Sequence, residues 1–148
     1  MKIAEIDTYL VKLPYTTGGT GNIGRMDWTT LDYVLIRIET EGGLVGWGDA
    51  FAYGGAALSV KAAVDHMLAP KLIGQDASAI GQLSYMLQQG HHLLGRYGIT
   101  MFAISGIDIA LWDLAGKAAG VPVSTLLGGA RRGEIPAYAS LFNYSDPD

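Results

Sequence analysis

Histidine is the first side chain to consider as a metal ligand or proton carrier, because the 148-residue sequence holds three histidines and no cysteine. His91 and His92 are adjacent, and neighbours on a helix or strand point in different directions, so both cannot face one ion. His66 lies in a separate segment beside Asp65. Without cysteine, neither a thiolate zinc site nor a disulfide can form. The pattern therefore favours surface or partly buried histidines over a metal centre.

Two aspartates lie in the most apolar stretch of the chain, residues 100–119. Asp113 precedes Lys117 by four residues, which is a favourable ion-pair spacing on a helix. Asp108 has no such partner, and a charge on a buried helix is costly unless it is paired. We expect Asp108 to reach the backbone or another element. A catalytic or metal-binding role is the alternative, but a structural, hydrogen-bonded carboxylate is favoured.

Residues 19–24 spell G-x-G-x-x-G, the spacing of a dinucleotide-binding fingerprint. That motif requires a helix immediately after it, whose N-terminal N–H groups face the pyrophosphate. Here residues 25–28 lead into a predicted strand instead. The pattern favours a glycine-rich loop over a nucleotide site. No G-x-S-x-G nucleophile elbow is present either.

Composition excludes several other classes. The net charge is −4, with 49% hydrophobic and 16% charged residues, which can fill a core. The ten basic residues are scattered, which argues against a nucleic acid or an anionic membrane as partner. No run of about 18 apolar residues could span a membrane. The first five residues lack the apolar segment of a signal peptide, so we expect a cytoplasmic protein.

Hydrophobic periodicity predicts an α+β fold, a three-stranded antiparallel meander followed by a helical layer. Pro70 is expected to end the first helix, and Asp76 to cap the second. Both faces of the second strand are largely apolar, so we expect part of it to be covered on both sides. Trp47 and Trp112 are expected in the core, and Trp28 near a ligand. The predicted strands are 2–13, 28–40 and 44–51, and the predicted helices are 56–69, about 77–89 and 100–119.

A further strand is predicted at 134–142, just before the last residues of the sequence. Such a strand has no partner left to pair with, and unpaired strand edges are a liability. We therefore expect the chain to be the front part of a longer protein.

Together these elements resemble the mandelate racemase and muconate lactonizing branch of the enolase superfamily. The most specific likeness is AISGIDIALWDLAGKAAGVPVSTLLGG, residues 103–129, and the second is GLVGWGDA, residues 43–50. The resemblance covers residues 2–142 in order. Asp49 departs from it, since relatives commonly carry glutamate in G-W-G-E, and no contact of that glutamate is transferred to this chain.

The resemblance implies a two-part enzyme. Residues 1–130 resemble its N-terminal capping domain, and residues 131–148 resemble the start of a C-terminal (β/α) barrel that is otherwise absent. In relatives the catalytic groups and the Mg²⁺ ligands lie on later barrel strands. The resemblance therefore implies that this chain holds no catalytic residue and no metal ligand, and that it is inactive by itself.

The whole enzyme would be a Mg²⁺-dependent isomerase or lyase that removes the proton α to a carboxylate, as a racemase, an epimerase or an acid-sugar dehydratase. Its implied partners are a small carboxylate substrate (a hydroxy acid or an acid sugar), its own barrel and further copies of itself as a homo-oligomer. Neither a nucleic acid nor a membrane is among them. The alternatives are a cycloisomerase or dipeptide epimerase of the same family, and a cap-like binding module without catalytic activity.

Two loops of the capping domain face the barrel mouth in relatives, and they match residues 15–28 and 52–56 here. Arg25 could pair with a distal carboxylate or with hydroxyl groups of a substrate. On the expected barrel strand, Ser140 shares a face with Tyr138 and could donate to a substrate carboxylate. The candidate substrate-binding residues are Tyr15, Thr16, Thr17, Arg25, Trp28, Tyr53 and Ser140.

Overall fold

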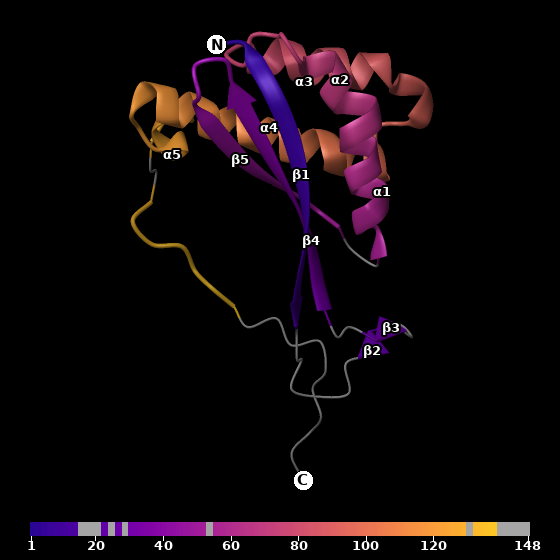
Figure 1. Cartoon of the computed structure of the whole chain (residues 1–148). Helices are drawn as coiled ribbons and strands as arrows, with labels where there is room; N and C mark the ends of the chain where they lie inside the picture. The colour runs from indigo at the N-terminus through magenta and orange to yellow at the C-terminus, as the bar shows by residue number, and fades with distance from the viewer. Residues whose placement is uncertain (15–21, 24–25, 28–29, 53–54, 130–131, 139–148) are drawn as a thin grey trace.

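The computed structural model describes residues 1–14, 22–23, 26–27, 30–52, 55–129 and 132–138. Figure 1 shows a twisted sheet with helices behind it and to one side. The strands are β1 (Ile3–Pro14), β2 (Asn22–Ile23), β3 (Met26–Asp27), β4 (Thr30–Thr40) and β5 (Val45–Ala50). The helices are α1 (Ala57–Ala62), the π-helical η2 (Ala63–Leu68), α2 (Ala69–Leu72), α3 (Ile80–Gly90), the 3₁₀-helical η3 (His92–Leu94), α4 (Gly98–Ala119) and α5 (Val123–Leu126).

The main sheet is the predicted antiparallel meander, with strand order β1-β4-β5. β1 pairs with β4 from Pro14 opposite Thr30 to Ile3 opposite Thr40. β4 pairs with β5 across a turn in which Gly43 has a φ of 79°, a conformation that favours glycine. The segment predicted as a loop over residues 15–27 holds one short antiparallel pair, β2 with β3. The α+β assignment is confirmed.

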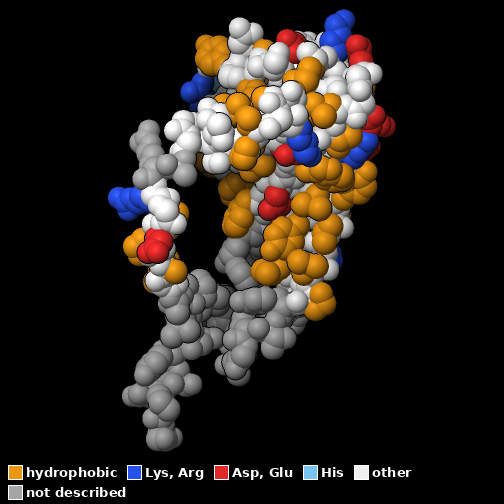
Figure 2. Space-filling view, turned by 90° about the vertical axis from the view of Figure 1, so that its left-hand side faces the viewer, with side chains coloured by type: hydrophobic (Ala, Val, Ile, Leu, Met, Phe, Trp, Pro, Cys, Tyr) orange, Lys and Arg blue, Asp and Glu red, His pale blue; other side chains and the backbone are white. Residues whose placement is uncertain are grey.

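The helices cover one face of this sheet. Along β4, Val34, Ile36 and Ile38 are fully buried, whereas the side chains that alternate with them are only half-buried. The expectation that β4 is covered on both faces is therefore wrong for the part of the chain that the structure describes. Figure 2 shows hydrophobic side chains gathered around the middle of the molecule, below an upper part of mixed character.

The long helix α4 packs directly on β5 and β4. Its residues Gly98–Ala119 meet the length and hydropathy expected of a membrane span, yet one side of it forms the domain core, as a buried core helix does. The outward Ile109 is 47% exposed, so the helix is buried on one side rather than all round. The buried side includes Ile104, Ile107, Leu111 and Leu114, which recur at helical spacing.

Glycines set the distance between α4 and β5. A Cβ placed on Gly48 would lie 2.0 Å from the carbonyl oxygen of Gly106, and one on Gly46 would lie 2.3 Å from that of Ala110. On the helix side, a Cβ on Gly106 would lie 2.7 Å from the Cβ of Ala50. Real Cβ atoms do not approach other atoms so closely, so the backbones meet with no side chain between them.

The first helical segment does not end at Pro70, as expected, but runs on from α1 through η2 to Leu72. Proline cannot donate a backbone hydrogen bond in the helix interior. Here Ala69 N–H donates to Val64 O, five residues back, which is the hydrogen bond of a π-helix. The wider turn precedes the proline, and Pro70 then occupies the first turn of α2, where its missing N–H costs little.

Asp76 is not the N-cap of the next helix, because α3 begins at Ile80. Its carboxylate instead accepts a hydrogen bond from the Met1 ammonium at 2.7 Å and from the Ser78 backbone N–H at 3.1 Å. Ala77 N–H donates to Met1 O, so the start of β1 is tied to the α2–α3 connection. The sequence pattern could not show this use of the aspartate, since the ammonium comes from 75 residues away.

The long helix ends where it is predicted to end, but the last predicted strand is not formed over its described residues. Gly120, in the left-handed region with φ of 67°, ends α4, and a short helix follows Pro122. Residues 134–138 form no strand. The reason is that a strand needs a partner for its backbone groups, and none of the described strands pairs with them. Residues 139–142 of the predicted strand lie outside the described residues.

Gly48→Ala should destabilise the domain strongly, because its methyl group would strike the Gly106 carbonyl and force α4 away from β5. We expect a loss of about 3 kcal/mol in the free energy of unfolding, measured by urea denaturation. Gly81→Ala is the matched control, since nothing lies within 4 Å of a Cβ there. It should be neutral or stabilising by up to about 1 kcal/mol, as alanine in an exposed helix. Equal effects of the two substitutions would contradict the tight contact.

Candidate functional site

The two segments that carry the predicted substrate-binding residues leave the same end of the sheet. β1 ends at Pro14, opposite Thr30 at the start of β4, so residues 15–29 connect two paired strands. β5 ends at Ala50, opposite Val34, and runs in the same direction as β1. The β1–β4 ribbon thus extends four residue pairs, about 13 Å, beyond the end of β5. Figure 1 shows this end of the ribbon pointing away from the helical layer.

The candidate side chains themselves lie outside the described residues. This holds for the first segment, for the second segment and for the expected barrel strand, so their substrate-binding role stays a prediction. The residues concerned are Tyr15, Thr16, Thr17, Arg25, Trp28, Tyr53 and Ser140.

A half-buried polar cluster ties the middle of β1 to α1 and η2. Lys61 Nζ donates to Asp65 Oδ2 at 2.7 Å and to the Thr8 carbonyl oxygen at 3.2 Å, and it also contacts Thr8 Oγ1. Thr8 Oγ1 donates to Asp65 Oδ1 at 2.5 Å. The cluster holds β1 against the helical layer at Thr8, six residues before the strand ends. Sequence reasoning missed it, although the i,i+4 spacing of Lys61 and Asp65 is a signal for an ion pair.

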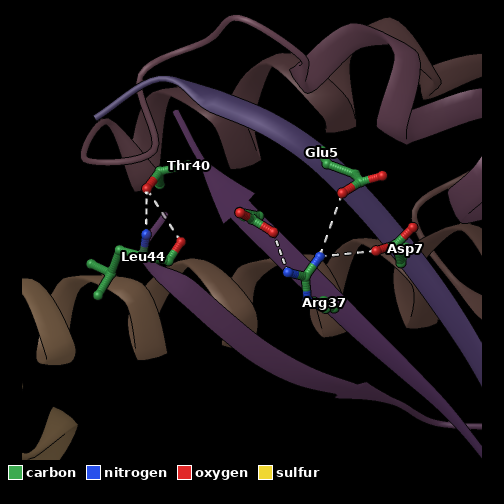
Figure 3. Close-up of polar contacts among 6 residues, drawn as sticks. Glu5, Asp7, Arg37, Thr40 and Leu44 are labelled. Carbon is green, nitrogen blue, oxygen red and sulfur yellow. Dashed lines mark hydrogen bonds and ion pairs between the residues drawn. The ribbon is translucent and has the colours of Figure 1, made fainter. Parts of the chain in front are cut away.

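A second cluster lies on the opposite face of the sheet, shown in Figure 3. Arg37 of β4 donates to Asp7 of β1 at 3.0 Å, contacts Glu39, and lies 3.6 Å from Glu5. The hydrogen bond to Glu39, followed by that to Asp7, raises the pKa of Arg37. Residue alternation on paired strands would have placed these four side chains on one face, so this cluster could have been predicted.

Figure 3 also shows how the β4–β5 turn is closed. Leu44 N–H donates to Thr40 Oγ1 at 3.1 Å, and Thr40 Oγ1 donates to the Leu44 carbonyl oxygen at 3.2 Å. Thr40 is one of two buried polar residues among those described. Its hydroxyl both donates and accepts a hydrogen bond, so it is fully paired. The turn therefore fixes the register between β4 and β5.

The free edge of β5 is covered by side chains from α4. Asp113 accepts a hydrogen bond from the Trp47 backbone N–H at 2.8 Å, and Lys117 donates to the Val45 carbonyl oxygen at 2.9 Å. The two side chains also form the predicted i,i+4 ion pair, at 2.6 Å. Because an uncovered edge offers its backbone groups to other chains, this pair both holds α4 in place and protects the edge.

The expected core tryptophans are less buried than predicted. Trp47 is 42% exposed on the helix-free face of the sheet, with its ring centroid 5.8 Å from that of Tyr9. Its backbone, not its ring, contacts α4, because the strand positions that face the helix are glycines. Trp112 is half-buried, and its indole donates to Asp108. Asp108 thus finds its partner one turn along the same helix rather than on the backbone or another element.

Burial raises the pKa of Asp108, and the hydrogen bond from Trp112 opposes this shift. The carboxylate has no countercharge among the interactions found in the described residues. Burial alone thus accounts for the raised pKa of Asp108, without a catalytic role. The prediction for this residue was a structural, hydrogen-bonded carboxylate.

No three Asp, Glu, His or Cys side chains converge to hold a metal ion within the described ranges. His91 and His92 each place Nδ1 2.8 Å from a backbone carbonyl oxygen, of Leu87 and Gln89 respectively. These bonds are structural, at the end of α3. The described residues therefore do not fit the Mg²⁺ ion that the family resemblance implies for the whole enzyme.

A three-stranded meander with helices on one face is the architecture of N-terminal domains in the enolase superfamily. The chain superposes on a member of that superfamily from Agrobacterium tumefaciens with a TM-score of 0.76 and 31% identity, covering 86% of this chain and 37% of that one. It superposes on the muconate lactonizing enzyme from Pseudomonas putida with a TM-score of 0.72 and 33% identity, covering 89% and 34%.

Within that class, residues 6–128 match the family model of the mandelate racemase / muconate lactonizing enzyme N-terminal domain, and the chain belongs to this family. It is 47% identical over 107 residues to a D-galactonate dehydratase from Pectobacterium atrosepticum, covering 72% of this chain and 27% of that protein. It is 37% identical over 116 residues to an arabinonate dehydratase from Saccharolobus solfataricus, covering 78% and 31%. The chain thus spans about a third or less of these relatives' lengths.

Asp113→Ala should weaken the edge of the sheet, because it removes the acceptor of the Trp47 N–H and the partner of Lys117. We expect a loss of about 1–2 kcal/mol in the free energy of unfolding. Asp113→Asn keeps an oxygen for the N–H and should lose less than half as much. Asp32→Ala, which removes only an exposed contact to Thr30, is the control and should change stability little. An asparagine variant as unstable as the alanine variant would argue against the N–H bond.

Asp108→Asn should make the domain more stable at pH 7, because the raised pKa means that folding disfavours the charged form. The gain should shrink as the pH falls through the window between the raised pKa and the ordinary value of 3.8, and it should vanish below that value. Thermal denaturation from pH 3 to 7 measures it.

Asp76→Asn should behave in the opposite way. The Met1 ammonium, and then Ser78, hold the pKa of Asp76 well below its usual range. The stability that this carboxylate contributes is therefore present at neutral pH and is lost only as the pH falls toward the lowered pKa. The asparagine variant should be less stable than the parent at pH 7, and melting curves that shift in the same direction for both variants would contradict the assignment.

Proposed function

We propose that this chain is the N-terminal part of an acid-sugar dehydratase, a Mg²⁺-dependent enzyme that removes the proton α to a carboxylate and expels the β-hydroxyl group. The observation that carries the proposal is the 47% identity to a D-galactonate dehydratase, together with the family match over residues 6–128. The arabinonate dehydratase supports the same substrate class, a polyhydroxylated carboxylic acid.

The reaction requires a base and a group that stabilises negative charge. A proton α to a carboxylate is weakly acidic, so a base must take it while the charge that develops on the carboxylate is stabilised. Loss of the β-hydroxyl as water then leaves an enol, which becomes a 2-keto acid. No group of described residues could hold a metal ion. As the family resemblance implies, we assign the catalytic base and the Mg²⁺ ligands to later barrel strands.

This chain would contribute substrate selection and the exclusion of water. Residues 1–130 would form the cap, and residues 131–148 would begin the barrel, with the segment at 134–142 pairing with barrel strands that this chain lacks. The loops at 15–28 and 52–56 would close over the substrate, since both leave the same end of the sheet. Arg25 would pair with a carboxylate or hydroxyl group remote from the reacting carbon.

A cycloisomerase is the second candidate, because the chain also superposes on the 3,6-anhydro-D-galactonate cycloisomerase from Zobellia galactanivorans, with a TM-score of 0.73 at 31% identity. The higher identity to the dehydratases makes it second. We further propose that the whole enzyme is cytoplasmic and homo-oligomeric, as the family resemblance implies.

A chimera tests the dehydratase proposal. Residues 1–130 of this chain would replace the matching segment of the Pectobacterium atrosepticum relative, and 2-keto acid formation from D-galactonate would be followed with and without Mg²⁺. We expect Mg²⁺-dependent turnover by the chimera and none by the 148-residue chain alone. Turnover by the chain alone, or a folded chimera that binds Mg²⁺ but is inactive, would overturn the proposal.

In the same chimera, Arg25→Ala should lower kcat/KM about ten- to a hundredfold, the loss of one charge-assisted hydrogen bond. Arg96→Ala is the matched control, since Arg96 is exposed between η3 and α4 on the helical layer. Unchanged kcat/KM for Arg25→Ala would remove this residue from the substrate site.

A further inference from the structure

The chain leaves β5 through an aromatic contact with α4. Phe51 follows the last residue of the strand, Ala50, and its ring centroid lies 5.0 Å from that of Phe102, with the two ring planes at 74°. This edge-to-face geometry is one of the favoured arrangements of two aromatic rings. The contact lies directly before residues 52–56, one of the two segments that carry the candidate substrate-binding residues.

The aromatic pair continues the close contact between α4 and β5. Gly48 and Ala50 of the strand both lie against Gly106 of the helix. Phe102 lies one helical turn before Gly106, and Phe51 comes directly after Ala50, so the two rings meet next along the same interface. The contact between the two elements thus changes from glycine to aromatic side chains where the strand ends.

The pair also changes the direction of the chain. Strict strand alternation would place Phe51 on the helix-free face, with Trp47 and Asp49. Its ring instead meets α4, and the next residue, Ala52, is buried. Phe51 remains 57% exposed, so its ring adds little to the core. The contact with Phe102 therefore acts mainly on the path that the chain takes as it leaves the sheet.

The segment after Phe51 is short, so its ends determine its direction. Only residues 52–56 separate Phe51 from the start of α1. At the far end, Gly55 has a φ of 82°, a conformation that favours glycine. The candidate substrate-binding residue Tyr53 comes two residues after Phe51 in the sequence. A change of direction at Phe51 would consequently be carried to Tyr53.

We propose that Phe102 is a positioning residue of the substrate site, because its contact with Phe51 fixes the direction in which residues 52–56 leave β5. Phe102 itself would not touch the substrate. Its effect on substrate binding rests on the proposed function, whereas the anchoring of the segment does not.

The proposal predicts a specific change in the kinetics. Without the ring contact, the segment would spend less time in the arrangement that binds substrate, and the apparent affinity would fall by that fraction. Saturating substrate selects the binding arrangement, so KM should rise while kcat stays unchanged. A variant that only loses stability would behave differently, because less folded enzyme lowers the measured kcat at the same KM.

NMR measurements on the 148-residue chain test the anchor without any substrate. In the parent we expect nuclear Overhauser contacts between the ring protons of Phe51 and Phe102. Phe102→Leu keeps an apolar side chain but removes the ring, and the backbone order parameter of Ala52 should fall from about 0.85 toward the flexible range below about 0.6. Phe51→Tyr keeps both rings and should leave this order parameter unchanged. Absence of the ring contacts, or an unchanged order parameter in Phe102→Leu, would overturn the anchor.

The chimera with the dehydratase tests the role in binding. Phe102→Leu should raise KM for D-galactonate about three- to tenfold, as expected for the loss of one aromatic pair. Phe51→Leu should do the same, and the double variant should be no worse than either single variant, because all three lose the same contact. Tyr85→Leu is the matched control, the same kind of change at a ring that is 66% exposed on α3.

The two measurements separate this proposal from the dehydratase proposal. An inactive chimera would overturn the dehydratase proposal, and the order parameter of Ala52 would still decide whether Phe102 anchors the segment. In an active chimera, the positioning role is refuted if Phe102→Leu leaves KM unchanged, if it lowers only kcat, or if its effect adds fully to that of Phe51→Leu.

Discussion

The contact between the backbones of α4 and β5 is the constraint on which the rest of this domain depends. Gly46 and Gly48 leave the strand without side chains toward the helix, and Gly106 does the same for the helix toward the strand. The helix α4 and the sheet therefore lie closer together than they could with side chains between them. Branched side chains on either side of the glycines fill the surrounding core. The core residues around this contact are Val34, Ile36, Ile38, Ile104, Ile107 and Leu111.

Polar ties then set the direction of the ribbon that leaves this core. Asp113 and Lys117 hold α4 to the outer edge of β5, while Lys61 of α1 and Asp65 of η2 bind Thr8 in β1. Between these ties the strands cannot rotate relative to the helices. The β1–β4 ribbon consequently extends beyond the core in one direction, and the ends that lead to the candidate binding segments come together there. A stable core thus positions segments that do not contribute to it.

The domain also separates its surfaces by chemistry. One face of the sheet is covered by its own helices, and one end leads to the candidate substrate segments. The helix-free face carries the ion pairs of Arg37 and the ring pair of Tyr9 with Trp47. The domain spans about a third or less of the lengths of the dehydratases that it matches. Among the described residues, no group of three Asp, Glu or His side chains could hold a metal ion.

By itself, the sequence determined the strands, the long helix and the family, because alternation, helical period and the stretch 103–129 are local patterns. Local patterns also place Asp113 beside Lys117. Only the tertiary structure decided the roles of Asp76 and Trp47, because each depends on a distant group. Asp76 binds the Met1 ammonium, and α4 packs against the glycines on either side of Trp47, so that the indole lies on the other face of the sheet. The role of Pro70 was missed for a local reason, the π-helical turn just before it. The predicted strand at 134–142 shows the same limit, since β-propensity without a partner does not make a strand.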